Sequence, residues 1–486
     1  MIPSKVFKEF QVSKKFLLIL GLGIGLVSTS PAQDLQSAIK NIDVRGMLRY
    51  RYTDDRYENQ NNIKDNNGNG KARHQYRAAI DFKTAPVNNI SFNLGLLYHN
   101  PLQNVNHGKG LPESNPPTNG AGAFLGRGLG AGADSHFGIS NFNMTLTPTD
   151  TTSIKLGKMV LNTPYSDVLH DRATGAIITN SDIQNWTFMA SIFDSWSVDD
   201  IYIGYLGDNR SIDKLFFSLA TLGNYQTKYG NFHTEIWGFH IKDLLKAGLY
   251  TQLSWERGIF FYNGFYSFAN LDNSNTSILY PLYNNEKLNP QTNKFKNKAD
   301  LFGIELGAKF HKFHIPLRVR IGYWGNTQDS YTVSLDNEGY YMSEPIGRIF
   351  FENSATGMTI SMLPNTGTQT PARNESNSLN LFYINPTYEI TKNLKVGIEY
   401  AYGKTQFQRG RGNDTYNAQI KFQEITPILT YQYTKQIRIT AYYAMLNTKS
   451  DKEILLKTKN TSAWDDNKQS QEEQRKRFRL ELRYNF

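Results

Sequence analysis

Cysteine is absent from the 486 residues. Disulfide bonds, thiolate nucleophiles and cysteine-ligated metals are therefore excluded. Beyond the N-terminal segment, the chain also lacks any apolar run of the roughly 20 residues that a membrane-spanning helix needs. The mean hydropathy is −0.51. A bundle of transmembrane helices is thus excluded, and the length leaves either two or three soluble domains or one large β-barrel.

Aromatic residues are abundant despite this low hydropathy. Tyrosine and phenylalanine each occur 29 times. Both ring types are enriched where a protein meets the membrane interface. A membrane-spanning barrel needs apolar residues only at the alternate positions that face lipid, so its mean hydropathy can stay low. The composition favours a barrel over soluble domains.

The N-terminus resembles a signal peptide over residues 1–32. Four lysines precede an apolar run at 16–27, and Ser30-Pro31-Ala32 provides a small-x-small cleavage site. A membrane anchor helix is the alternative, although the run is short for one. Residues 1–32 hold four basic and one acidic residue, so cleavage lowers the formal charge from +10 to +7. We expect an exported chain, with residues 33–486 forming one domain and no nucleic-acid partner.

The last nine residues, Phe478–Phe486, alternate strictly between apolar and polar side chains. A period of two places the apolar side chains on one face of a strand and the ionic ones on the other. A half-buried edge strand of a soluble sheet has the same alternation. A strand that ends the chain on an aromatic residue is typical of outer-membrane barrels, which favours a strand facing lipid.

Similar alternating segments recur along the chain, separated by short turns and longer polar segments. Eight turns and nine longer segments predict about 18 antiparallel strands, an even number that allows the sheet to close and lose its edges. The turns lie near 86–89, 148–150, 181–185, 225–231, 257–258, 312–314, 391–393 and 434–436, and the longer segments near 53–71, 100–135, 163–173, 194–213, 242–246, 269–299, 326–378, 405–414 and 448–473.

Basic residues gather on the polar faces of the first two and last two predicted strands. An arginine or lysine facing lipid at the bilayer centre would cost roughly 2–4 kcal/mol, so these side chains should face the lumen. Closure would unite them into one basic wall, although some could lie at the rims and pair with nearby carboxylates. The main wall candidates are Arg45, Arg49, Arg51, Arg77, Arg438, Arg479 and Arg483.

The segment at 157–175 should leave the wall, because Thr163-Pro164 stops a strand: proline donates no hydrogen bond. Its pattern, Gly157-Lys158-x-x-Leu161-Asn162 followed by Tyr165-Ser166-Asp167, Asp171 and Gly175, resembles the third loop of Campylobacter-type major outer membrane protein (MOMP) porins. The first strand, with Gly46-x-Leu48-Arg49-Tyr50-Arg51-Tyr52, also resembles this family, which includes the Helicobacter Hof-type outer membrane proteins.

This resemblance implies an 18-stranded trimeric porin with the third loop folded into the lumen and Asp167 and Asp171 near the pore constriction. His170 and Arg172 depart from the family pattern and would change the charge of that constriction. Calcium as a cofactor is implied by the resemblance only, because no ligand set can be matched and the metal site is unknown. Lys158 shares the outward face of Ile154 and Leu156, where contact of a lysine with lipid would be unfavourable. We therefore expect a neighbouring subunit to cover this wall.

No spacing of serine, histidine and carboxylates indicates a catalytic site, so we do not expect an enzyme. We expect passive diffusion of small polar or charged solutes, in contact with outer-membrane lipid and lipopolysaccharide. The charge balance predicts weak anion preference or near neutrality, whereas the family resemblance implies cation passage. The alternative is a surface adhesin that binds host receptors through loops such as 326–378.

Overall fold

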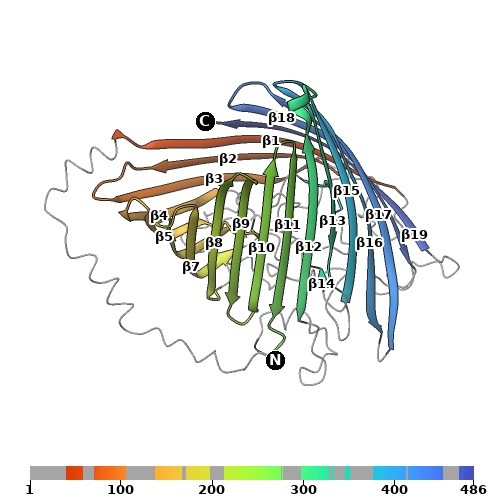
Figure 1. The fold of residues 1–486 in the computed structure, drawn as a ribbon, viewed down its shortest axis with the longest axis horizontal. Helices are drawn as coiled ribbons and strands as arrows, with labels where there is room; N and C mark the ends of the chain where they lie inside the picture. Colours follow the sequence, from red (N-terminus) through yellow and green to blue (C-terminus); the bar gives the residue numbers. More distant parts are fainter. Residues whose placement is uncertain are drawn as a thin grey trace.

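The computed structural model describes residues 40–58, 71–105, 137–166, 171–197, 213–274, 276, 297–327, 331–332, 345–350, 376–411, 414–451 and 470–486. No helix in these ranges has the length and apolar character to cross a membrane. The predicted signal peptide lies outside the described residues, so it stays a prediction. The described part consists almost entirely of β-strands (Figure 1).

Eighteen antiparallel strands form the wall of a closed barrel. A further short strand, β14 (Tyr331–Thr332), pairs parallel with β12 inside the connection between β13 and β15. The wall strands are β1 (Asp43–Glu58), β2 (Lys71–Lys83), β3 (Ile90–Val105), β4 (Phe137–Thr149), β5 (Thr152–Val160), β6 (Arg172–Asn180), β7 (Trp186–Ser197), β8 (Phe216–Thr227), β9 (Gly230–Ile241), β10 (Leu245–Arg257), β11 (Phe260–Leu271), β12 (Lys298–Lys309), β13 (Leu317–Gly325), β15 (Ser376–Thr391), β16 (Leu394–Arg411), β17 (Asp414–Gln432), β18 (Ile437–Asp451) and β19 (Ser470–Asn485).

Each wall strand pairs with its neighbours in the sequence, and β19 pairs with β1 to close the barrel. Figure 1 shows this as rainbow order, with red β1 beside the blue strands of the C-terminus. The seam ends in two backbone hydrogen bonds: Gly46 N–H donates to the Phe486 carbonyl (2.9 Å), and Phe486 N–H donates to the Gly46 carbonyl (3.0 Å). The predicted 18-strand barrel is therefore confirmed.

The two faces of the wall differ as the alternation predicts. On β19, Phe478, Leu482 and Tyr484 are exposed on the outer face, whereas Arg477 and Arg479 are buried inside. Most other wall strands also expose aliphatic or aromatic side chains on the outer face. Exposing so much apolar surface to water would be unfavourable, at about 25 cal/mol per Å². The outer face therefore suits lipid, and the soluble edge strand is wrong.

The eight predicted turns lie at one end of the barrel, the turn end, and the remaining connections, most of them longer, lie at the other, the loop end. All eight predicted turns are found. The turn between β12 and β13 holds a 3-10 helix, η2 (Phe310–Phe313), closed by His314 in the left-handed conformation (φ 59°).

The predicted loop at 405–414 is wrong. β16 continues to Arg411 and β17 begins at Asp414, and the two strands stay paired from Leu394↔Tyr431 to Arg411↔Asp414. Backbone ladders need no apolar side chains, so a strand can continue into water with polar residues. Gly410, inside the predicted loop, pairs with Thr415 of β17.

Candidate functional site inside the barrel

Four arginines stand side by side on neighbouring strands of the inner wall. Arg438 of β18 lies opposite Arg483 of β19, Arg483 lies opposite Arg49 of β1, and Arg49 lies opposite Arg77 of β2. Directly opposite residues of an antiparallel pair share a face. That face is the inner one, because Leu48, next to Arg49 in the chain, is exposed on the outside. We call these four residues the arginine row.

The centre of the arginine row is buried and short of acceptors. Arg49 is 5% exposed, and within the described ranges its buried Nε has no hydrogen-bond partner. Besides Arg483, the charged side chains that act on it include Arg51, Arg77, Arg479 and one carboxylate, Glu481. Since like charges in direct register destabilise a sheet, the row costs stability and leaves a concentrated positive charge on the inner wall.

The other predicted wall residues share the inner face and have local partners, as does Arg483 of the row, whose Nε donates to the Asn485 side chain (3.0 Å). Arg51 forms an ion pair with Glu481 (Nη2–Oε2 2.7 Å). Arg479 donates to the Thr53 hydroxyl (3.2 Å) and lies over the Tyr442 ring. Arg45, with its side chain 80% exposed at the turn end, pairs with Asp43 of its own strand (2.8 Å). Only Arg45 follows the alternative of a rim residue with a neighbouring carboxylate.

Above the arginine row, toward the loop end, a buried ion pair crosses the seam. Arg477 of β19, which is fully buried, contacts Asp55 of β1 through both ends of its guanidinium (Nε–Oδ1 2.7 Å, Nη2–Oδ2 3.0 Å). A two-point arginine–carboxylate contact fixes geometry as well as charge. The pair therefore sets the register between the first and last strands.

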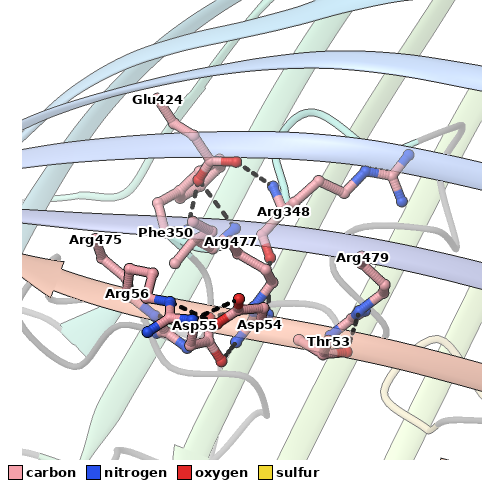
Figure 2. A network of polar contacts seen from close by, with 11 residues as sticks. Thr53, Asp54, Asp55, Arg56, Arg348, Phe350, Glu424, Arg475, Arg477 and Arg479 are labelled. Carbon is pink, nitrogen blue, oxygen red and sulfur yellow. Dashed lines mark hydrogen bonds and ion pairs between the residues drawn. The ribbon is translucent and has the colours of Figure 1, made fainter. Parts of the chain in front are cut away.

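A part of the long connection between β13 and β15 lies against this seam (Figure 2). We call residues 345–350 the inner segment; all six are buried. The Glu424 carboxylate of β17 accepts the backbone N–H groups of Arg348 (2.5 Å), Ile349 (2.9 Å) and Phe350 (2.8 Å). Thr426 donates a fourth hydrogen bond to Glu424 (2.9 Å). One carboxylate thus anchors a turn of backbone in the interior.

Arg348 ties the inner segment to three further wall strands, two through its side chain and one through its carbonyl oxygen. Its guanidinium binds the Glu399 carboxylate of β16 at two points (2.8 and 2.6 Å) and lies 5.2 Å from the centre of the Tyr442 ring. Arg477 lies at 3.5 Å from the Arg348 carbonyl oxygen. Arg348 and Arg479 both contact Tyr442, so the connection adds an arginine beside the basic wall.

Pro345, the first residue of the inner segment, is held by the buried guanidinium of Arg320. Arg320 of β13 and Asn385 of β15 both donate to the Pro345 carbonyl (2.9 and 3.1 Å). Arg320 in turn forms a buried ion pair with Glu305 of β12 (3.0 Å). At the other end, the Phe350 ring stacks on Phe422 at 5.6 Å.

Sequence reasoning missed the inner segment, because 326–378 was read only as a long surface loop. The signal was the set of large apolar residues Ile346, Ile349 and Phe350 within otherwise polar sequence.

The predicted constriction residues are only partly described. Asp167 and His170 lie outside the described residues. Asp171 and Arg172 are buried at the start of β6, where the Arg172 guanidinium donates to the Asp171 carbonyl (2.7 Å). Leu161 N–H donates to the same carbonyl (3.1 Å), which joins the two ends of the third loop. As predicted, the wall strand ends just before Thr163-Pro164.

The Tyr165 side chain, beyond the end of β5, contacts two strands on another part of the wall. Its hydroxyl donates to the Leu249 carbonyl of β10 (3.1 Å) and is hydrogen-bonded to the Ser267 hydroxyl of β11 (2.6 Å). Its ring packs edge-on against Phe239 at 5.2 Å.

The contacts of Tyr165 join a chain of inward-facing aromatic rings. This chain runs along the wall opposite the charged one through Trp196, Phe216, Phe239, Tyr165, Tyr250, Phe265 and Trp324. One side of the interior is thus aromatic and the other is basic.

Lys158 is 1% exposed, and the Asn143 amide donates to its carbonyl (2.9 Å). The expectation that Lys158 needs a neighbouring subunit to cover it is therefore wrong, because the chain itself buries this side chain. The trimer stays a prediction.

The family model described as Campylobacter major outer membrane protein matches residues 14–484. The chain belongs to this family. Membership and fold identify it as a porin of the bacterial outer membrane, and they point to a channel without enzymatic activity.

Solved structures agree on the fold of this MOMP-family porin. OpdO of Pseudomonas aeruginosa aligns with a TM-score of 0.53 at 12% identity, covering 93% of this chain and 99% of its own. OpdL of the same organism aligns at 0.54 and 12%, covering 92% and 99%. The outer membrane protein OpdK, also of P. aeruginosa, aligns at 0.51 and 9%, covering 91% and 99%. A comparison with curated proteins found no match.

The adhesin alternative and the calcium site are both without support from these comparisons and from the described residues. Neither the family model nor these neighbours supports the adhesin alternative. Among the described residues, no three histidine or carboxylate side chains gather as metal ligands, and two of the predicted constriction residues lie outside that part. Calcium stays an implication of the family resemblance.

Proposed function

We propose that this porin passes small polar and charged solutes by passive diffusion, with a weak preference for anions. The observation that carries the proposal is the arginine row, in which Arg49 is buried between other arginines and its Nε has no hydrogen-bond partner among the described residues. A unit positive charge about 6 Å from a monovalent anion in water attracts it by roughly 0.7 kcal/mol, which raises the local anion concentration about threefold. Several such charges on one wall therefore raise the anion concentration inside.

The bore is narrowed, in this proposal, by two elements that leave the wall. The third loop supplies Asp167 and Asp171, and the inner segment supplies Arg348. The contacts of Tyr165 with β10 and β11 support an inward path for the third loop. The acidic loop and the basic wall would then produce a field across the lumen, as narrow pores use to select ions.

The native form is proposed to be a homotrimer, made after removal of residues 1–32. The first test is a planar bilayer recording of the purified chain. We expect the conductance to rise in steps of the size of open porins. Across a salt gradient, the reversal potential should have the sign of a channel slightly more permeable to chloride than to the cation. A barrel without conductance would overturn the channel proposal. Strong cation selectivity would overturn the role of the arginine row and leave the channel intact.

A further inference from the structure

The outer face of β16 changes character in steps toward the loop end. Leu394, Val396 and Ile398 come first, then Tyr400 and Tyr402, and then Lys404. Ile398 and Tyr402 are exposed, which places this set of alternate residues on the outside. Aromatic rings prefer the depth at which hydrocarbon gives way to headgroups. Lys404 therefore lies at headgroup level.

Two more lysines lie in direct register with Lys404. Lys404 is opposite Lys421 of β17, and Lys421 is opposite Lys449 of β18. Lys449 pairs with Glu472 of β19 (2.9 Å), but both side chains are more than half exposed. Within the described ranges, neither Lys404 nor Lys421 forms an ion pair. Since like charges directly opposite one another repel, this row destabilises the sheet, and a bound anion would relieve the repulsion.

Two more outward-facing basic residues follow nearer the turn end across the seam, since Lys476 lies opposite Met445 of β18 whereas Lys449 lies opposite Glu472. Lys476 of β19 lies opposite Arg56 of β1, on the loop-end side of Phe478 and Tyr52. Arg56 pairs with Asp54 (2.8 Å). Together the outward-facing residues Lys404, Lys421, Lys449, Lys476 and Arg56 form what we call the outer basic belt. Figure 1 shows β16 and β17 running side by side, and β18 and β19 follow them in the sheet.

We propose that the outer basic belt binds the phosphate groups of a phosphorylated glycolipid in the outer leaflet. Long loops of outer-membrane barrels face the cell exterior, so the belt meets the headgroups of that leaflet. The aromatic residues below it fix the depth, and the lysines provide donors that suit phosphate oxygens. The belt faces away from the lumen, so the proposal is independent of solute passage.

The test uses the full chain, refolded in detergent, and bisphosphorylated lipid A as the probe. Native mass spectrometry measures lipid bound by the parent and by the triple variant K404Q/K421Q/K449Q. A basic residue near an anionic lipid surface changes binding roughly fivefold, so we expect affinity to fall roughly 100-fold for three. Lipid A from which both phosphates have been removed should bind the two proteins equally weakly.

The matched control removes three lysines from the turn end. K312Q/K392Q/K435Q removes the same number of positive charges as the test variant, but from connections that face the opposite leaflet. Its affinity for lipid A should equal that of the parent. Unchanged heat-modifiable migration and single-channel conductance would show that both variants fold. Equal lipid A binding by the parent and K404Q/K421Q/K449Q overturns the proposal, and so does equal loss in the control. A change in self-association without loss of lipid also overturns it, because the belt would then be a subunit contact.

Discussion

Arg49 on the first wall strand lies directly opposite Arg483 on the last. Barrel closure thus places two guanidinium groups in register at the seam, where a sheet would be more stable with opposite charges. The closing strand contributes an apolar outer face for lipid and a basic inner face for solutes. The same 16-residue element, β19, therefore serves both assembly and the electrostatics of the lumen.

Replacing both residues, as R49Q/R483Q, should lower the chloride-to-potassium permeability ratio. Each charge accounts for roughly a threefold change in local anion concentration, so the pair should produce a change of several fold. The measurement is the reversal potential across a potassium chloride gradient. R45Q is the control, because Arg45 is mostly exposed at the rim and already paired with Asp43. An equal shift in R45Q would contradict a special role for the arginine row.

Glu424→Ala should release the inner segment. The substitution leaves three buried N–H groups, those of residues 348–350, without their acceptor, and each unsatisfied group costs about 1–3 kcal/mol. We expect larger or noisier conductance and new trypsin cleavage after Arg348. Glu472→Ala is the control, since Glu472 is exposed on the outer face. Protection of Arg348 equal to that of the parent would contradict the anchoring role of Glu424.

The barrel itself could be predicted from the sequence because its rules are local. Alternation along Phe478–Phe486 gave the correct faces, and the turn residues gave the correct number of strands. Closure then followed from the even count. The prediction failed where pairing continued in polar sequence, as in the tall hairpin of β16 and β17. There the backbone ladder alone determines the strand ends, and side-chain polarity carries no signal.

The interior was harder to predict, because its contacts join distant parts of the chain. The arginine row could be anticipated, since closure brings the first and last strands together. Glu424 and Arg348 are 76 residues apart, and no periodicity links a strand to the middle of a loop. Lys158 was misjudged for a related reason: alternation gives the face of a residue but not what covers that face.

Asp55→Asn should destabilise the barrel far more than Asp54→Asn. Asp55 neutralises Arg477 in a buried pair, and losing one partner of such a pair costs about 3–5 kcal/mol. Asp54 faces outward and pairs with the partly exposed Arg56, where about 0–1 kcal/mol is expected. The temperature at which the folded band disappears on a denaturing gel measures the difference. The double variant D55N/R477M should recover part of the loss, and equal effects of D54N and D55N would contradict a buried charge pair.

Tyr165→Phe tests whether the third loop narrows the bore. The substitution keeps the ring against Phe239 but removes the hydroxyl that bonds Ser267 and the Leu249 carbonyl, a loss of about 1–3 kcal/mol. Because this weakens the attachment of the loop to β10 and β11, conductance should fluctuate more. Tyr165→Ala also removes the ring and should raise the mean conductance.

Ser267→Ala leaves the bond to the Leu249 carbonyl and should have a smaller effect than Tyr165→Phe. If the hydroxyl pair is the attachment, the double variant Y165F/S267A should be little worse than Y165F alone, since both changes remove one shared bond. Additive effects would mean that Ser267 acts elsewhere. Parental conductance in Tyr165→Ala would mean that the third loop does not limit the channel, and the inner segment around Arg348 would then be the narrowing element.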